Sequence, residues 1–180
     1  MTDFVTHTLD TAPEASKPLL ENAQKAYGFV PNLLGTMADA PALLEGYMTL
    51  SKIVGKTALS ETERQIILMT NNRLNGCTYC MAAHSAVALH AGVTTEDVDA
   101  LRDGAPLADG KHEALHRFTV TMVQKRGWAS DADMTKLLDH GYTRQTILEV
   151  ILAIGMKTLS NYTNHVAHTP VDRAFEKYAW

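Results

Sequence analysis

A helical spacing of apolar residues runs through almost the whole chain, and it restricts the fold more than any other feature. Apolar residues recur three and four positions apart, whereas runs that alternate apolar and polar residues, as half-buried strands do, are missing. The sequence therefore predicts an all-α protein. At 180 residues, and without a linker rich in Gly, Pro or Ser, we expect one compact multi-helix domain over residues 1–180.

Prolines, capping residues and glycines divide this pattern into separate helices. Ser60 and Glu63 have the spacing of a capping box, in which each side chain accepts a hydrogen bond from the other residue's backbone N–H. The expected helices cover residues 13–27, a short segment from 31, 41–54, 60–74, 81–91, 95–101, 110 to about 127, 130–141 and 143 to beyond 159, with a final turn or helix from 170 to 180.

The only two cysteines, Cys77 and Cys80, lie where a new helix is expected to begin, and His84 follows one turn later. Asn75-Gly76 ends the preceding helical pattern, so the cysteines fall in the first turn of the next, central helix. Unpaired backbone N–H groups and the helix dipole favour a thiolate there. Because residues three and four apart share a helical face, His84 is expected to exchange a proton with the Cys80 sulfur.

Three interpretations of this motif remain open. Cys77 and Cys80 form a redox dithiol, they bind zinc together with His84 and a fourth ligand, or they are buried packing residues. We favour the dithiol, because a Cys-x-x-Cys pair at a helix start is seldom accidental. In the expected order, Cys80 attacks the oxidised substrate with help from His84 and Cys77 resolves the product, although the reverse order stays open.

Other polar residues have both a structural and a functional interpretation. Tyr79, between the cysteines, either packs or donates a hydrogen bond to a leaving atom. His112 and His116 are one turn apart but lack a third ligand at a recognised offset, so no metal site is expected there. The polar end of the long last helix is interpreted as a subunit interface or cap, with a rim of the thiol site as the alternative; it contains Asn161, Asn164, His165 and His168.

Charge and hydropathy exclude several classes of protein. The net charge of −4 and the lack of a cluster of Lys and Arg with interleaved aromatics argue against a nucleic-acid partner. The N-terminus does not resemble a signal peptide, and no stretch reaches membrane-spanning length. We therefore expect a cytoplasmic protein with no membrane partner and no cofactor. In a reducing cytosol, a lone cysteine pair is more often catalytic or metal-binding than structural.

Two segments, Glu63-Arg64-Gln65-Ile66-Ile67-Leu68 and Asn75-Gly76-Cys77-Thr78-Tyr79-Cys80-Met81-Ala82-Ala83-His84, resemble the core motif of the AhpD-like, carboxymuconolactone decarboxylase superfamily. Residues 28–32 and 41–44 are similar to the N-terminal part of its longer, peroxidase-related members, and residues 161–165 and 169–172 to their C-terminal part. Residues 59–92 then carry the core redox motif.

This resemblance implies an all-helical fold, a homotrimer or homohexamer, and alkylhydroperoxidase or disulfide reductase activity through Cys77 and Cys80, with His84 as the relay histidine. It also implies a peroxide or disulfide substrate, a thiol reductant such as a lipoyl or thioredoxin-type donor, and a peroxiredoxin as a further partner. The decarboxylase branch lacks the Cys-x-x-Cys pair, so the resemblance points to the redox branch.

The chain departs from the motif at Gln65, where members of this type usually have a glutamate that accepts the relay proton. Glutamine keeps the hydrogen-bonding shape and loses the titratable carboxylate. Glu61, one turn earlier on the same face, is a candidate substitute through a water, whereas Glu63 faces away. The sequence thus predicts weak peroxidase activity, and the alternatives are a non-catalytic thiol redox sensor or a Cys2His zinc-binding protein.

Overall fold

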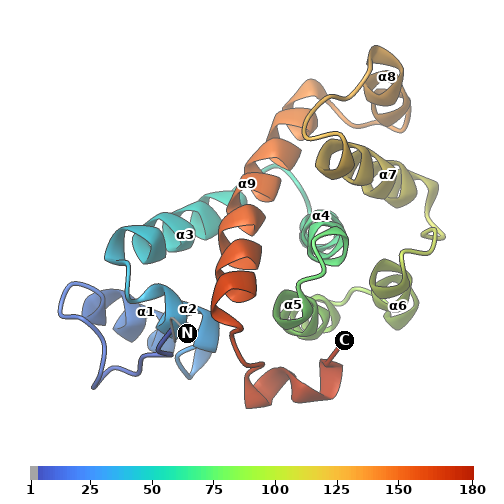
Figure 1. The fold of residues 1–180 in the computed structure, drawn as a ribbon. Helices are drawn as coiled ribbons and strands as arrows, with labels where there is room; N and C mark the ends of the chain where they lie inside the picture. The colour runs from blue at the N-terminus through green and yellow to red at the C-terminus, as the bar shows by residue number, and fades with distance from the viewer. Residues whose placement is uncertain (1–3) are drawn as a thin grey trace.

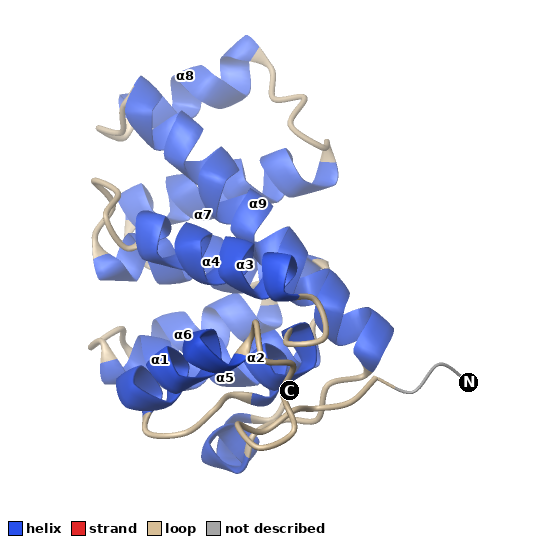
Figure 2. Cartoon of the chain, turned by 90° about the vertical axis from the view of Figure 1, so that its left-hand side faces the viewer, coloured by secondary structure: helices blue, strands red, loops and turns tan. Residues whose placement is uncertain are grey.

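The computed structural model of the chain describes residues 4–180, which fold into α-helices and one 3-10 helix, with no strand among them (Figures 1 and 2). The predicted all-α fold is confirmed. The elements are α1 (Lys17–Tyr27), α2 (Asn32–Met37), α3 (Pro41–Val54), α4 (Glu61–Leu74), α5 (Thr78–His90), α6 (Thr95–Asp103), α7 (Gly110–Gln124), α8 (Asp131–Asp139), α9 (Arg144–Ala167) and the 3-10 helix η1 (Arg173–Tyr178).

Side-chain caps fix several helix starts where the sequence predicts them. The capping box of α4 is complete, because Ser60 Oγ accepts from the Glu63 N–H and the Glu63 carboxylate accepts from the Ser60 N–H. Helix α1 differs, since it begins at Lys17 and not at residue 13. Ser16 occupies the position before it, but its hydroxyl donates to the carbonyl of Ala38 and does not cap the helix.

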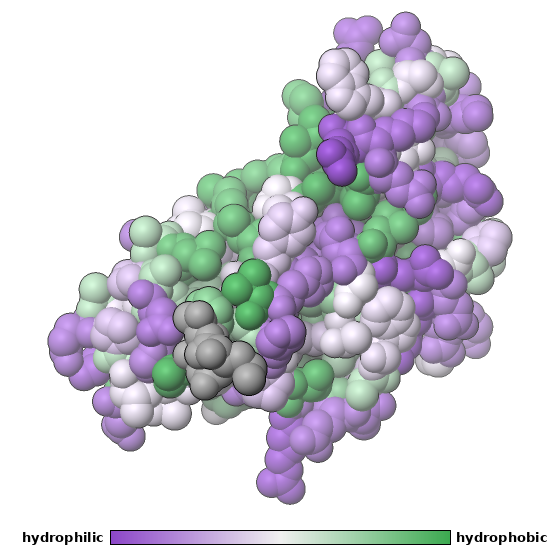
Figure 3. Space-filling view, in the orientation of Figure 1, coloured by the Kyte–Doolittle hydropathy of each residue, from purple (hydrophilic) through white to green (hydrophobic). Residues whose placement is uncertain are grey.

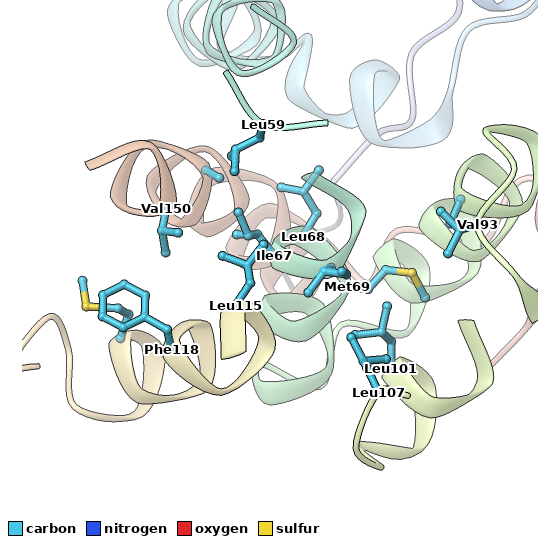
Figure 4. Packing of buried hydrophobic residues seen from close by; sticks show 14 of the residues in the cluster. Leu59, Ile67, Leu68, Met69, Val93, Leu101, Leu107, Leu115, Phe118 and Val150 are labelled. Atoms are coloured by element: carbon cyan, nitrogen blue, oxygen red, sulfur yellow. The ribbon is translucent and has the colours of Figure 1, made fainter. Parts of the chain in front are cut away.

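Helix α4 lies at the centre of the molecule and packs against α5, α7 and α9 (Figure 1). Its apolar side chains, among them Ile67 and Met69, are buried in one cluster with Leu115 and Phe118 of α7 and Val150 of α9 (Figure 4). Burying each such side chain stabilises the fold by roughly 1.5–3 kcal/mol before entropy is counted. The helix that precedes the cysteines is therefore held firmly on several sides.

A second cluster of buried residues joins α1, α2 and α3 to the start of α5. It contains Cys77, Tyr79 and Cys80 together with Leu20 and Leu44. Tyr47 of α3 packs against both clusters. The cysteines thus lie at the seam between the N-terminal helices and the central helix pair α4 and α5.

Hydrophobic side chains also reach the surface along α9 and the adjoining end of α3 (Figure 3). Leu148, Ile151 and Val166 of α9 and Ile53 of α3 are exposed. Among the described residues, no helix combines the length and the apolar character that crossing a bilayer requires.

Candidate active site

The first turn of α5 holds both cysteines, but only Cys80 lies inside the helix. Cys77 occupies the N-cap position with an extended backbone, and Cys80 is the third helical residue. Asn72, at the end of α4, fixes this turn: its carbonyl accepts from the Cys77 N–H at 2.9 Å, and its side chain donates to the Cys80 carbonyl at 3.2 Å. The end of α4 therefore sets the position of the dithiol.

Buried amides tie this arrangement to α9. Asn161, which is fully buried, donates to Asn72 Oδ1 at 3.1 Å and accepts from Asn75 Nδ2 at 2.9 Å. One turn later, Asn164 Nδ2 lies 3.1 Å from Cys80 Sγ and 3.6 Å from Cys77 Sγ. The polar end of the last helix, interpreted above as an interface or cap, supplies a donor to both sulfurs.

Lys157 of α9 brings a positive charge to the same place. It is the largest of the fully buried side chains, with 1% of its surface exposed. Its Nζ lies 3.1 Å from Nε2 of His84. A buried ammonium group is costly unless other groups compensate its charge, and the charge of Lys157 in turn lowers the pKa of Cys80.

His84 has hydrogen-bond partners on both ring nitrogens, and neither is a cysteine. Nδ1 lies 2.9 Å from Gln65 Oε1, and Gln65 Nε2 donates to Glu61 Oε1 at 2.7 Å. With Gln65 oriented in this way, Nδ1 of His84 carries the proton and Nε2 accepts from Lys157. The residues form one chain, Glu61–Gln65–His84–Lys157, in which Glu61 bonds Gln65 directly and needs no bridging water.

The two thiols are strongly differentiated. Burial would raise the pKa of Cys80, but a hydrogen bond from Cys77 and the charge of Lys157 lower that pKa well below its usual value. The same hydrogen bond and burial raise the pKa of Cys77. Burial and the neighbouring Lys157 charge lower the pKa of His84 far below its usual value, so His84 is neutral at neutral pH. Of the two thiols, Cys80 is therefore the more acidic.

Cys80 borders a cavity of about 480 Å³ between α3, α5 and the C-terminal segment. His84, Lys157, Gln65 and Glu61 line one part of its wall. The rest is mostly apolar, with aromatic side chains from Tyr27, Phe29, Tyr47 and Phe175. Volumes of this size accept small organic molecules.

The other residues that the sequence singled out have partners other than the two sulfurs. Tyr79 points away from the sulfurs, because its hydroxyl donates to Asp172 and accepts from the Leu33 N–H. His116 bonds Glu113 and does not line the cavity at Cys80. Glu63 pairs with Lys111 of α7 as well as capping α4. Within residues 4–180, no three His, Cys, Asp or Glu side chains are grouped as a metal site would need.

Lys157 is the functional candidate that sequence reasoning missed. It lies seven residues after Val150 and four after Ala153, both fully buried, and so falls on the buried stripe of α9. A lysine at such a position is the available signal, because lysine is almost never fully buried unless its charge is paired. What it pairs with depends on a contact with His84 across 73 residues of chain.

The comparisons with known proteins agree with this architecture. Residues 41–121 match the sequence profile described as the carboxymuconolactone decarboxylase family. A search of curated proteins gives no match. A peroxidase-related protein from Ralstonia eutropha JMP134 with an alkylhydroperoxidase AhpD core superposes with a TM-score of 0.86 at 20% identity, over 96% of this chain and 93% of that one.

Two further solved structures show the same fold. A peroxidase-related protein from Silicibacter sp. TM1040 has a TM-score of 0.82 at 22% identity, over 96% of this chain and 93% of its own. A variant of the debrominase Bmp8, in complex with 2,3,4-tribromopyrrole, has a TM-score of 0.82 at 18% identity, over 99% and 96%. Residues 41–121, which carry both cysteines, thus match the carboxymuconolactone decarboxylase family profile, and residues 4–180 share the fold of AhpD-like, peroxidase-related proteins.

Proposed function

We propose that this chain is a thiol-dependent peroxidase that reduces small apolar hydroperoxides with Cys80 as nucleophile and Cys77 as resolving thiol. The observation that carries the proposal is the position of Cys80, whose sulfur borders an apolar, aromatic cavity next to a buried cation. Because Cys80 is only 1% exposed, a protein disulfide is too bulky to reach it, whereas a small hydroperoxide fits the cavity.

In the first step, the Cys80 thiolate attacks the distal oxygen of the hydroperoxide and the O–O bond breaks. Cys80 becomes a sulfenic acid, and the alkoxide leaves with a proton that Lys157, on the same cavity wall, is placed to give. His84 holds the Lys157 ammonium toward the cavity through Nε2. In this chain the histidine therefore positions the proton donor and does not itself deprotonate Cys80.

In the second step, Cys77 attacks the sulfenic sulfur, the S–O bond breaks, and water leaves with the Cys77 proton as the disulfide forms. Interaction with Cys80 is the largest cause that raises the pKa of Cys77. Conversion of Cys80 to the sulfenic acid removes its negative charge, so Cys77 ionises more readily once the first step is complete. Cys77 therefore reacts only after Cys80 has been oxidised, so the two thiols do not react with hydroperoxide separately.

The test is a single-turnover measurement with cumene hydroperoxide. The wild-type protein should lose two thiols per chain and form the Cys77–Cys80 disulfide, while Cys80→Ser should consume no hydroperoxide. Cys77→Ser should consume one equivalent and stop at the sulfenic acid, which a dimedone label detects. Full multiple turnover by Cys77→Ser would contradict the two-cysteine mechanism.

Metal analysis of the same samples tests the zinc alternative. Stoichiometric zinc with two unreactive thiols would replace the proposal by a metal site. A disulfide that forms but does not turn over in the presence of a dithiol reductant would favour a redox sensor.

A halogenated aromatic compound is the second candidate substrate. Aromatic side chains line the cavity at Cys80, and the debrominase Bmp8 has the same fold. Release of bromide from 2,3,4-tribromopyrrole by the reduced protein, at a rate that exceeds cumene hydroperoxide consumption, would favour this function over the peroxidase.

A further inference from the structure

The two sulfurs of the dithiol border different cavities. Cys80 lines the aromatic cavity of about 480 Å³, which Cys77 does not reach, and Cys77 lines a second cavity of about 450 Å³, which Cys80 does not reach. The second cavity lies between the start of α5 and the end of α9, and its other walls are Gly76, Thr78, Tyr79, Asn164, His165, His168 and Thr169. Its walls are mainly polar, unlike those of the first.

Two buried polar atoms on this second cavity have no hydrogen-bond partner. They are Oδ1 of Asn164 and Oγ1 of Thr169, on residues that are 6% and 8% exposed. Buried polar groups in folded proteins are nearly always paired. Asn164 Nδ2 is already committed to the sulfurs, so its free oxygen can only accept, and a ligand that satisfies it must carry a donor such as a hydroxyl or an amide N–H.

We propose that the cavity at Cys77 is the binding site of the reductant, a small dithiol that carries a hydroxyl or amide donor, so that oxidant and reductant reach the dithiol through separate cavities. The inference rests on the proposed redox cycle of Cys77 and Cys80. It assigns a site to the reduction of the disulfide, the half of the cycle for which the aromatic cavity provides no site.

The chemistry balances as two thiol–disulfide exchanges. One thiolate of the reductant attacks Cys77 Sγ, the Cys77–Cys80 bond breaks, and Cys80 leaves as a thiolate. The second thiol of the reductant then attacks the reductant sulfur that is bonded to Cys77. The mixed disulfide breaks, and Cys77 is released and takes up a proton. The reductant becomes a cyclic disulfide and passes two electrons to the protein.

The difference between the two thiols favours this direction of attack. A thiol of lower pKa leaves faster from a disulfide, and Cys80 is the sulfur whose thiolate the protein stabilises, through Lys157 and the Cys77 hydrogen bond. Attack at Cys77, from the polar cavity, therefore expels the better leaving group. Attack at Cys80, from the aromatic cavity, would expel the poorer one.

Two probes with the same carbon chain test the site. Dithiothreitol carries two hydroxyl groups, and 1,4-butanedithiol lacks them. The Cys77–Cys80 disulfide is formed with diamide, so that the measurement does not depend on any reaction with hydroperoxide, and its reduction by each probe is followed by stopped flow. The ratio of the two rate constants, compared between variants at one pH, cancels the intrinsic difference between the probes.

Four variants separate the two cavities. Thr169→Val removes the unpartnered hydroxyl and His165→Trp fills the polar cavity from an exposed position, whereas Val87→Trp fills the aromatic cavity. Thr163→Val, on the same helix as His165 but outside both cavities, is the control for loss of a threonine hydroxyl.

Thr169→Val should lower the preference for dithiothreitol over 1,4-butanedithiol by about fivefold, as expected for one lost hydrogen bond. His165→Trp should slow reduction by both probes about tenfold or more, since it closes the route to Cys77. Thr163→Val and Val87→Trp should reduce like wild type, and Val87→Trp alone should slow oxidation by cumene hydroperoxide.

Unchanged reduction in both Thr169→Val and His165→Trp would overturn the proposal, as would slower reduction in Val87→Trp. Failure of the wild-type protein to react with cumene hydroperoxide would instead defeat the proposed peroxidase function, because reduction of the diamide-formed disulfide is measured separately.

Discussion

At the scale of single residues, the hydrogen bond between the sulfurs is the main cause that separates the pKa values of two cysteines only three positions apart. It lowers the pKa of Cys80 and raises that of Cys77, and the charge of Lys157 lowers the pKa of Cys80 further. Burial, together with the Lys157 charge, lowers the pKa of His84 and keeps it neutral. In the proposed mechanism, the relay histidine that the sequence predicts becomes a residue that positions Lys157.

Replacing Lys157 by methionine should make Cys80 a weaker nucleophile at neutral pH. Removal of the cation disfavours the thiolate, so the pKa of Cys80 rises, the thiolate fraction at pH 7 falls, and higher pH restores it. In a Cys77→Ser background, alkylation by iodoacetamide at pH 7 should slow by at least about tenfold, because a neighbouring opposite charge shifts the pKa of such a group by roughly one unit or more. The protein should still fold, since a buried ion is replaced by an apolar chain of similar length.

The control for this change is Lys52→Met, which removes an exposed lysine from the last turn of α3. Its alkylation profile should coincide with that of the parent. If the profile of Lys157→Met also coincided with the parent from pH 5 to pH 9, Lys157 would have no part in ionising Cys80.

The next scale is that of the helices, where the four-residue spacing of α4 brings Glu61 and Gln65 onto one face. The Gln65 amide donates to Glu61 and accepts from His84, and only a group with both a donor and an acceptor can do this. Burial would raise the pKa of Glu61, but the bonds from Gln65 and Arg64 lower it. The glutamine therefore keeps Glu61 ionised while it orients His84.

Gln65→Glu should create a pair of carboxylates that share a proton. Two carboxylates at hydrogen-bond distance cannot both ionise easily, so one pKa rises and the basic form appears only above it. Once ionised, the new carboxylate accepts from Nδ1–H of His84 and makes Nε2 a stronger acceptor for the Lys157 proton donor, so hydroperoxide-dependent disulfide formation should increase with pH, by about tenfold. In the double variant Glu61→Gln, Gln65→Glu the repulsion is absent, so the same increase should occur at lower pH. Coincident pH–rate profiles for the two variants would show that the new carboxylate does not join the relay.

The sequence predicts these helices well because their starts are local. Ser60 and Thr143 cap α4 and α9 as expected, since a cap needs only residues within one turn. Helix α1 starts late because Ser16 bonds Ala38, a partner 22 residues away. The candidate site shows the same division: Cys77, Cys80 and His84 are visible as a motif, whereas the contacts of Lys157 and Asn164 depend on how α9 crosses α5. Long-range packing is the part that spacing alone does not encode.

Considered as a whole molecule, the chain closes its aromatic cavity with its own C-terminal segment. Residues 173–178 pack against α5 (Figure 1), and Phe175 lies edge-on to Phe29 with ring centroids 6.0 Å apart. Asp172 accepts from Tyr79 and from the Asn32 N–H, which ties the start of the segment to α5 and α2. The expected homotrimer or homohexamer stays a prediction, for which the exposed apolar residues of α9 offer a surface. The mass of the protein in solution checks it.

Arg102 of α6 holds the far end of this segment. Its guanidinium donates to the carbonyls of Tyr178 and Ala179 and to Ser85 Oγ of α5, each at 2.9 Å. Arg102→Ala removes all three bonds, so the segment should open more often and expose the Phe175 side of the cavity to water. Because an apolar substrate depends on that wall and hydrogen peroxide does not, the rate ratio of cumene hydroperoxide to hydrogen peroxide should fall about fivefold, equivalent to roughly 1 kcal/mol.

Arg144→Ala, which removes an exposed arginine at the start of α9, is the matched control and should leave the ratio unchanged. Faster hydrogen exchange at the Phe175 and Ala179 amides, which are bonded within the segment, should accompany the loss of selectivity in Arg102→Ala. If exchange accelerated while the ratio stayed constant, the segment would be mobile without forming part of the substrate wall. If neither changed, the three bonds of Arg102 would not be what keeps the segment closed over the cavity. The contact between Phe29 and Phe175 and the hydrogen bonds of Asp172 would then be sufficient to hold it.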